Sequence, residues 1–275
     1  MGTRMIRAAK WVAICAAAAY VALLALLYIG QEDALFLFAP VPDNHEYSFS
    51  LPTKDVTLDG EGYSLHGVLF KSESDSNKRL VIYFKGNGGN VGNSERMART
   101  FADLGFDVLS MDYRGYGKSK GERSEAAMLD DALRWYDWGT EQAYSEIRVV
   151  GWSMGSAFSS HLAANRPVDH LIQFAPFKSV VDMGARTFPV IPEFLFAILS
   201  EYPFRNDLKL ASANLQSYTI YHGTDDRIVP FASGKALADY LGDKVALFPV
   251  EGASHDSIPW EAEVLRDIRS NWADE

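Results

Sequence analysis

The chain has 275 residues, of which 48% are hydrophobic and 13% aromatic, enough for a membrane segment and one domain with a large core. Its formal net charge of -10 argues against a nucleic-acid partner, because such a partner requires a basic protein face. Cys15 is the single cysteine, which excludes an intramolecular disulfide and the cysteine-rich metal sites. No metal or organic cofactor is expected.

The first strong feature is a run of 19 residues without charge, at positions 11–29. A helix of this length spans about 28 Å, close to the hydrocarbon thickness of a bilayer. The run therefore predicts an uncleaved transmembrane anchor. A cleaved signal peptide is the alternative, but its hydrophobic region is usually shorter, and residues 28–32 offer no clear small-x-small cleavage site.

The flanks of the anchor predict its orientation. Residues 1–10 contain Arg4, Arg7 and Lys10 and no acid. The positive-inside rule then keeps this end in the cytoplasm and puts the rest of the chain on the extracytoplasmic side of the membrane. Residues 30–53 are expected to form an extended connector that lies along the domain or the bilayer surface and has no catalytic role, and residues 54–275 the folded domain.

The domain is predicted to begin with a β-hairpin. Residues 56–58 and 63–70 alternate apolar and polar side chains around the turn sequence Asp59-Gly60-Glu61-Gly62. His66, in the second strand, is expected at the surface of the sheet rather than as a ligand. Residues 80–84 are a continuous apolar run, which is typical of a strand buried on both faces.

A glycine-rich loop follows this strand, with the sequence Lys85-Gly86-Asn87-Gly88-Gly89-Asn90. A phosphate-binding loop would need a Gly-Lys-Ser/Thr ending, and a dinucleotide fingerprint would need a glycine at Val91, so both patterns fail. An oxyanion hole needs only a backbone N–H at the end of the strand. The N–H of Asn87 is the candidate for the first donor, and that of Met154 for the second.

The rest of the domain alternates strands with helices, which predicts a mostly parallel sheet with helices on both faces. The expected strands lie at 106–111, 147–150, 168–174, 218–222 and 245–250, and the expected helices at 94–104, 125–138, 156–164, 231–241 and 260–272. Ser124 is a plausible N-cap, and residues 112–121 are expected to be a structural loop. Residues 176–205, rich in aromatics and prolines, predict a small helical cap that fills core, lines an acyl pocket or touches the bilayer.

The sequence Gly151-Trp152-Ser153-Met154-Gly155 is the centre of this pattern. It lies between an apolar strand and a helix, and glycines two residues on either side of the serine allow a tight turn that presents the hydroxyl at the end of the sheet. This is the position of a nucleophile. An ordinary turn serine is the alternative.

Together these motifs resemble the α/β-hydrolase superfamily, and more narrowly its membrane-anchored serine hydrolases, which include lipid and protein-thioester hydrolases. The resemblance covers residues 56–272. It implies an α/β-hydrolase fold of about eight strands with a small helical cap, here preceded by one transmembrane helix. Relatives usually begin the oxyanion loop with His-Gly, whereas this chain has Lys85-Gly86.

The resemblance also implies the chain order nucleophile, acid, histidine, and Ser153, Asp226 and His255 meet that order. Asp225 is the adjacent competitor for the acid. Asp256 is too close in sequence to His255 to orient it. The remaining candidate bases, His161, His170 and His222, are expected to be packing, surface or structural residues.

A serine needs a base within hydrogen-bond reach, and that base needs a partner that fixes its tautomer. We therefore expect a membrane-anchored serine hydrolase that cleaves an ester or thioester of a small-molecule or lipid acyl substrate through a Ser-His-Asp triad. A serine peptidase on the same fold is one alternative. A catalytically inactive, membrane-tethered binding protein is the other, and Lys85 is the residue that favours it.

Overall fold

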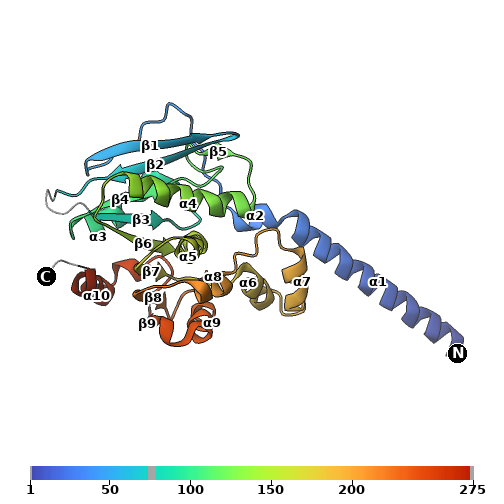
Figure 1. The fold of residues 1–275 in the computed structure, drawn as a ribbon. Coiled ribbons are helices and arrows are strands. Elements are labelled where there is room, and N and C mark those ends of the chain that lie inside the picture. Colours follow the sequence, from blue (N-terminus) through green and yellow to red (C-terminus); the bar gives the residue numbers. More distant parts are fainter. Residues whose placement is uncertain (1, 74–78, 273–275) are drawn as a thin grey trace.

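The computed structural model describes residues 2–73 and 79–272. Within them, one nine-stranded sheet has the order β1-β2-β4-β3-β6-β7-β8-β9, and the short β5 pairs with β2 (Figure 1). The strands are β1 (Thr53–Gly60), β2 (Tyr63–Phe70), β3 (Arg79–Phe84), β4 (Phe106–Met111), β5 (Lys120–Gly121), β6 (Glu146–Trp152), β7 (His170–Phe174), β8 (Ser217–Gly223) and β9 (Ala246–Val250). Strands β1 and β2 are antiparallel, and every neighbouring pair from β4 to β9 is parallel. The predicted hairpin and mostly parallel sheet are confirmed.

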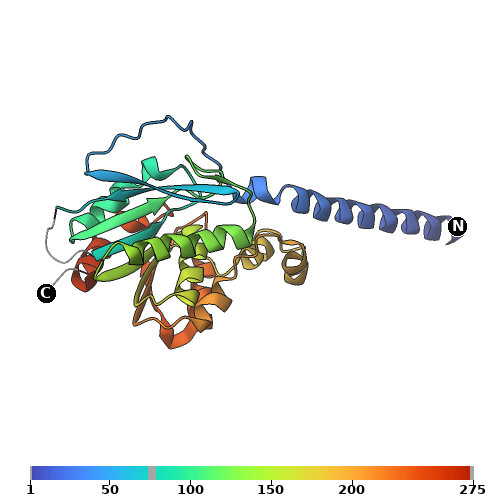
Figure 2. The same cartoon turned by 45° about the horizontal axis from the view of Figure 1, so that its top comes forward.

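Helices cover both faces of this sheet (Figure 2). The side chains of strand β3 pack against both layers of helices. Leu80, Ile82 and Phe84 belong to one hydrophobic cluster, and Val81 and Tyr83 to another. Successive side chains of a strand point to opposite faces, so a strand buried on both sides is apolar throughout. The first cluster includes α4 (Glu125–Glu141), α5 (Gly155–Asn165), α8 (Asn206–Ser212) and α9 (Phe231–Leu241), and the second includes α3 (Glu95–Ala102) and α10 (Ala262–Trp272).

Helix α1 (Gly2–Ile29) projects from one end of the domain (Figures 1 and 2). Its segment from Thr3 to Ile29 is long and apolar enough to cross a membrane, and none of its most apolar stretch is buried within the protein. An exposed apolar helix of this length needs an apolar partner, which a bilayer supplies. By length and composition, α1 is a candidate membrane span.

The connector differs from the extended segment expected from its composition. Residues 31–35 form the short helix α2 (Gln31–Leu35), and Phe36 is buried in the core, 2% exposed, with its ring edge against Tyr202. Further along, Tyr47 stacks on His66 and Phe49 packs against Phe70. The connector therefore lies along the domain, one of the two placements expected for it, and covers part of the sheet.

The cap segment (residues 176–205) lies between β7 and the helix that precedes β8. It contains α6 (Val180–Thr187) and α7 (Glu193–Leu199), which pack against each other. Figure 1 shows both helices beyond the end of the sheet, on the side where α1 leaves the domain. The cap segment and the anchor are therefore neighbours in space.

Candidate active site

Ser153 lies at a sharp turn between β6 and α5. Its φ is 52°, in the left-handed region that residues with a Cβ rarely adopt, and its N–H donates to the Phe174 carbonyl oxygen at 2.9 Å. Such a conformation persists only where the surrounding structure holds it, and it occurs often at functional sites. The structure therefore has the strand, turn and helix expected around this serine.

The two flanking glycines are required by close approach rather than by their own torsion angles. A Cβ on Gly155 would lie 2.0 Å from the Phe84 carbonyl oxygen, and one on Gly151 would lie 2.3 Å from the Ser159 hydroxyl oxygen. Because Phe84 ends β3, the start of α5 can touch this strand only with glycine at position 155. The motif thus brings Ser153 beside the glycine-rich loop that follows β3.

His255 and Asp226 form a hydrogen-bonded pair. The distance between His255 Nδ1 and Asp226 Oδ2 is 2.7 Å, and the second carboxylate oxygen accepts the N–H groups of Ile228 and Val229, each at 2.9 Å. With Nδ1 committed to the carboxylate, Nε2 is the nitrogen left for a proton from a substrate or nucleophile. Asp225, the competing acid, is exposed, whereas Asp226 is buried.

A cavity of about 720 Å³ brings the predicted residues together. Ser153, Met154, Asn87 and His255 all line it, and Asp226 lies behind His255. Among the described residues, no hydrogen bond joins the Ser153 hydroxyl to His255. Catalytic hydrogen bonds often tighten only when a substrate is bound.

The other histidines are placed differently. His222 is fully buried and bonds the Val229 carbonyl oxygen at 2.8 Å, and its burial lowers its pKa. Burial also lowers the pKa of His161, on α5, to about 4 and that of His170, which bonds Ser217. None of these three rings is among the described residues that line the cavity with Ser153.

The glycine-rich loop lies directly against the serine. A Cβ built on Gly86 would be 3.8 Å from the Ser153 Cβ. The side chain of Asn87 points to the connector, where it donates to the Leu35 carbonyl oxygen at 2.6 Å and accepts from the Tyr116 hydroxyl at 2.6 Å. Within the described part of the chain, the backbone N–H groups of Asn87 and Met154 have no acceptor. They are therefore available to an oxyanion.

The side chain of Lys85 supports this loop. Its side chain is buried, its ammonium donates to the Gly89 carbonyl oxygen at 3.0 Å, and the Tyr116 ring centroid lies 4.4 Å away. Burial lowers the pKa of Lys85 to about 8, and the charge of Asp112 opposes that shift. Lys85 is thus a buried amine that braces the loop.

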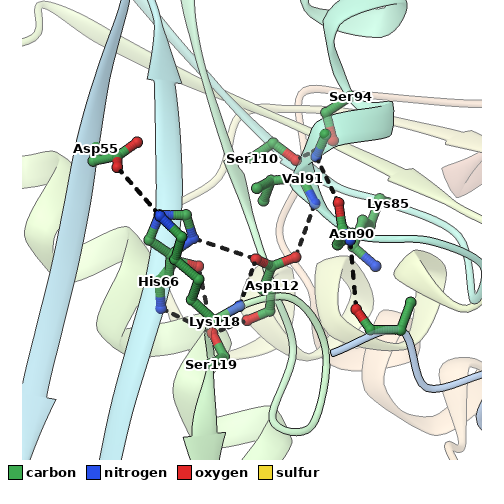
Figure 3. A network of polar contacts seen from close by, with 12 residues as sticks. Asp55, His66, Lys85, Asn90, Val91, Ser94, Ser110, Asp112, Lys118 and Ser119 are labelled. Carbon is green, nitrogen blue, oxygen red and sulfur yellow. Dashed lines mark hydrogen bonds and ion pairs between the residues drawn. The ribbon is translucent and has the colours of Figure 1, made fainter. Parts of the chain in front are cut away.

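Asp112 connects the loop to the sheet edge. Figure 3 shows its carboxylate between His66 and the N–H of Val91, with distances of 3.2 Å to His66 Nδ1 and 2.8 Å to Val91 N. The expectation that His66 is a surface residue is wrong, because Tyr47 of the connector stacks on the ring and leaves the residue 5% exposed. No local signal around His66 indicates this cover, since it comes from a segment that crosses the edge of the sheet.

Solved structures show the class of protein that this fold defines. The structure overlays an esterase from Pyrococcus furiosus with a TM-score of 0.66 at 17% identity, covering 87% of this chain and 98% of that one. It overlays Est1E from Butyrivibrio proteoclasticus, solved with ferulic acid bound, with a TM-score of 0.64 at 19% identity, covering 79% and 98%. The fold is that of the α/β hydrolases.

Sequence comparison identifies the family. Residues 75–217 match the family described as serine aminopeptidase, S33, and the chain belongs to this family of α/β-hydrolase serine hydrolases. It is 30% identical to an uncharacterised protein of Mycobacterium tuberculosis, covering 88% of this chain and 89% of that one. It is 29% identical to the lysophosphatidylserine lipase ABHD12 of Xenopus tropicalis, covering 83% and 70%, and 30% identical to that of Mus musculus, covering 70% and 56%.

Proposed function

We propose that this hydrolase is a membrane-anchored serine hydrolase that cleaves an ester or thioester of a lipophilic acyl substrate. The observation that carries the proposal is the His255–Asp226 pair at the same cavity as Ser153, whose left-handed backbone conformation between strand and helix is that of a nucleophile elbow. The similarity to lysophosphatidylserine lipases and the largely apolar lining of the cavity support a lipid substrate.

The proposed reaction has two halves. The Ser153 oxygen attacks the acyl carbonyl carbon while its proton moves to His255 Nε2, and the N–H groups of Asn87 and Met154 bind the negative oxygen. His255 then protonates the departing alcohol or thiol, which leaves an acyl-serine. Water, deprotonated by His255, attacks the acyl-serine and releases the acid, and the proton returns to Ser153.

Turnover of a short-chain aryl ester by the full chain tests this proposal. Ser153→Ala should abolish turnover, because no other group provides the nucleophile. Ser156→Ala, a buried serine three residues along on α5, is the matched control and should retain it. An unchanged rate in Ser153→Ala would contradict the assignment.

A serine peptidase is the second candidate, favoured by the description of the family as serine aminopeptidases. It would use the same three residues. Paired ester and amide substrates with the same acyl group separate the two activities: we expect the ester to be cleaved and the amide to remain intact. Faster cleavage of the amide would favour the peptidase.

The proposed topology places residues 1–10 in the cytoplasm and the catalytic domain outside it, on the basis of Arg4, Arg7 and Lys10. Protease added to intact cells should therefore degrade the domain. A C-terminus that is protected in intact cells and cleaved only after lysis would reverse the orientation.

A further inference from the structure

Helix α7 is apolar on two opposite faces. Phe196 and Leu199 line the cavity, whereas Phe194 and Ile198 point outward and are 61% and 71% exposed. Val190, in the turn before the helix, is 72% exposed as well. A surface helix normally turns a polar face to water, so an outer face of this kind indicates an apolar partner.

The final turns of α1 form part of the same cavity. Leu24, Leu27 and Tyr28 line it together with Ser153 and His255. Leu24 and Leu27 are half-buried, whereas Val21 and Leu26, on other sides of the helix, are 64% and 69% exposed. The candidate membrane span therefore supplies one wall of the cavity that contains the proposed nucleophile.

Hydrogen bonds fix the end of α1 to the end of the cap segment. The Tyr28 hydroxyl donates to Glu201 Oε1 at 2.9 Å, and the N–H of Glu201 donates to Gln31 Oε1 at 2.8 Å. The Tyr202 hydroxyl is also bonded to Glu32. Figures 1 and 2 both show α7 beside the last turns of α1. The outer face of α7 is therefore held close to the apolar surface of the span.

The position of Leu24 along α1 indicates what this face contacts. If the uncharged run ending at Ile29 spans the bilayer, Leu24 lies five residues inside that end, or about 8 Å along the helix axis. Tyr28, an aromatic residue of the kind enriched at membrane interfaces, stands near the boundary. The cavity wall formed by α1 then reaches below the lipid headgroups, and so does the cap segment beside it.

We propose that Val190, Phe194 and Ile198, the outer apolar face, insert into the lipid leaflet beside α1, and that the cavity opens to this leaflet between α1 and the cap segment. An acyl lipid then enters from the bilayer without crossing water. Hydrolysis of this lipid in the cavity rests on the proposed function, whereas insertion of the outer apolar face does not.

Labelled single-cysteine proteins test the insertion. The full chain, with Cys15→Ala to remove the native thiol, carries a single new cysteine at Ile198→Cys. The control carries it on α9, at Tyr240→Cys. Each cysteine is labelled with an environment-sensitive fluorophore, and the protein is placed in phosphatidylcholine vesicles. Tyr240 is 50% exposed and lies outside the cap segment. We expect brominated acyl chains to quench the label at 198 and aqueous iodide to quench the label at 240. Iodide quenching at 198 without bromolipid quenching would overturn the proposal.

A second copy of the chain or another protein would also shield position 198 from iodide. Such contacts give no bromolipid quenching, and those between copies disappear when the protein is diluted to one chain per vesicle. Bromolipid quenching that persists on dilution supports insertion, and shielding that is lost on dilution overturns it.

Activity gives a second test. Phe194→Ser with Ile198→Ser should lower turnover of a long-chain ester embedded in vesicles by about tenfold, because both apolar anchors are lost. Turnover of a water-soluble short-chain ester should be unchanged, since neither residue lines the cavity. Leu208→Ser with Tyr240→Ser, which removes exposed apolar groups of α8 and α9, is the matched control and should leave both rates unchanged. An equal loss with both esters would contradict entry from the leaflet, and a wild-type chain that cleaves neither would contradict only the proposed function.

Discussion

Two hydrogen-bonded histidine–aspartate pairs lie in the described part of the chain, and their surroundings differ. His255 and Asp226 are 2.7 Å apart beside a large cavity that Ser153 also lines. His66 and Asp112 are 3.2 Å apart, and Tyr47 stacks over the histidine. Neither His66 nor Asp112 lines that cavity.

The difference shows which pair is suited to the proposed catalytic role. An imidazole held by a carboxylate can act as a base only where a nucleophile and a substrate can reach its other nitrogen. Nε2 of His66 faces Asp55 at 3.7 Å instead, and Asp112 also accepts the N–H of Val91. The first pair therefore has the access that its proposed role requires, whereas the second links strand β2 to the segment that follows the glycine-rich loop.

Removing each imidazole should separate the two roles most clearly. His255→Ala should lower turnover of the short-chain ester on the order of 10⁴-fold or more, because Ser153 loses its base. His66→Ala should keep turnover within about tenfold of wild type, because its ring touches no reacting group. Initial rates on the full chain in detergent check both, and equal losses would remove the distinction between the pairs.

Replacing each carboxylate by an amide should sharpen the comparison. Asp226→Asn should lower turnover about 10⁴-fold, since an amide facing Nδ1 favours the wrong tautomer of His255. Asp112→Asn should instead lower the free energy of unfolding by about 2 kcal/mol, because it weakens buried hydrogen bonds to a charged acceptor. Urea unfolding alongside the rate assay measures both, and a stable but inactive Asp112→Asn would give the second pair a catalytic role.

The first pair differs from the second in having Ser153 nearby, and the turn that holds Ser153 depends on Gly155. Gly155→Ala should lower the free energy of unfolding by about 3 kcal/mol, because the new Cβ would lie 2.0 Å from the Phe84 carbonyl oxygen and must displace backbone. Gly88→Ala is the control, since a Cβ there meets nothing within 4 Å. Thermal unfolding of the two variants compares them, and equal stability would show that the turn tolerates a side chain.

Lys85 should give the smallest effect, visible as a pH dependence. In the folded chain the pKa of Lys85 is about 8, below its ordinary 10.5. Between these two pH values the unfolded chain therefore binds a proton at Lys85 that the folded chain does not. The free energy of unfolding should therefore rise with pH between about 8 and 10, by about 1 kcal/mol per unit, and Lys85→Met should lack this contribution. Lys120→Met, at an exposed lysine, controls for net charge. An identical slope in wild type and Lys85→Met would mean that burial does not lower the pKa of Lys85.

Local patterns were sufficient to predict the sheet and the turn at Ser153. Strand β3 is apolar from Leu80 to Phe84 because both of its faces are covered, and the glycines at 151 and 155 are needed for close packing. The mostly parallel sheet and the superfamily followed from such features. Helix α9 has the predicted limits of 231–241, and Ser124 caps α4 by accepting the N–H of Ala127.

Contacts between distant segments could not be predicted in the same way. His66 is buried by Tyr47, which nothing in the alternation of β2 indicates. Phe36 enters the core from a segment that mixes aromatic residues with prolines and has no regular pattern, and Leu24 reaches the cavity although it lies in the candidate span. These contacts depend on where distant segments of the chain pack on the folded sheet. The roles of Ser153, Asp226, His255 and the two oxyanion N–H groups stay predictions.

Reaction with a fluorophosphonate probe tests the central claim most directly, because only an activated serine is modified. Mass spectrometry of the full chain after labelling should find the probe on Ser153, and labelling should be lost in His255→Ala while persisting in His66→Ala. Absence of labelling in the folded wild-type chain, or labelling of Ser153 that survives the loss of His255, would contradict the account.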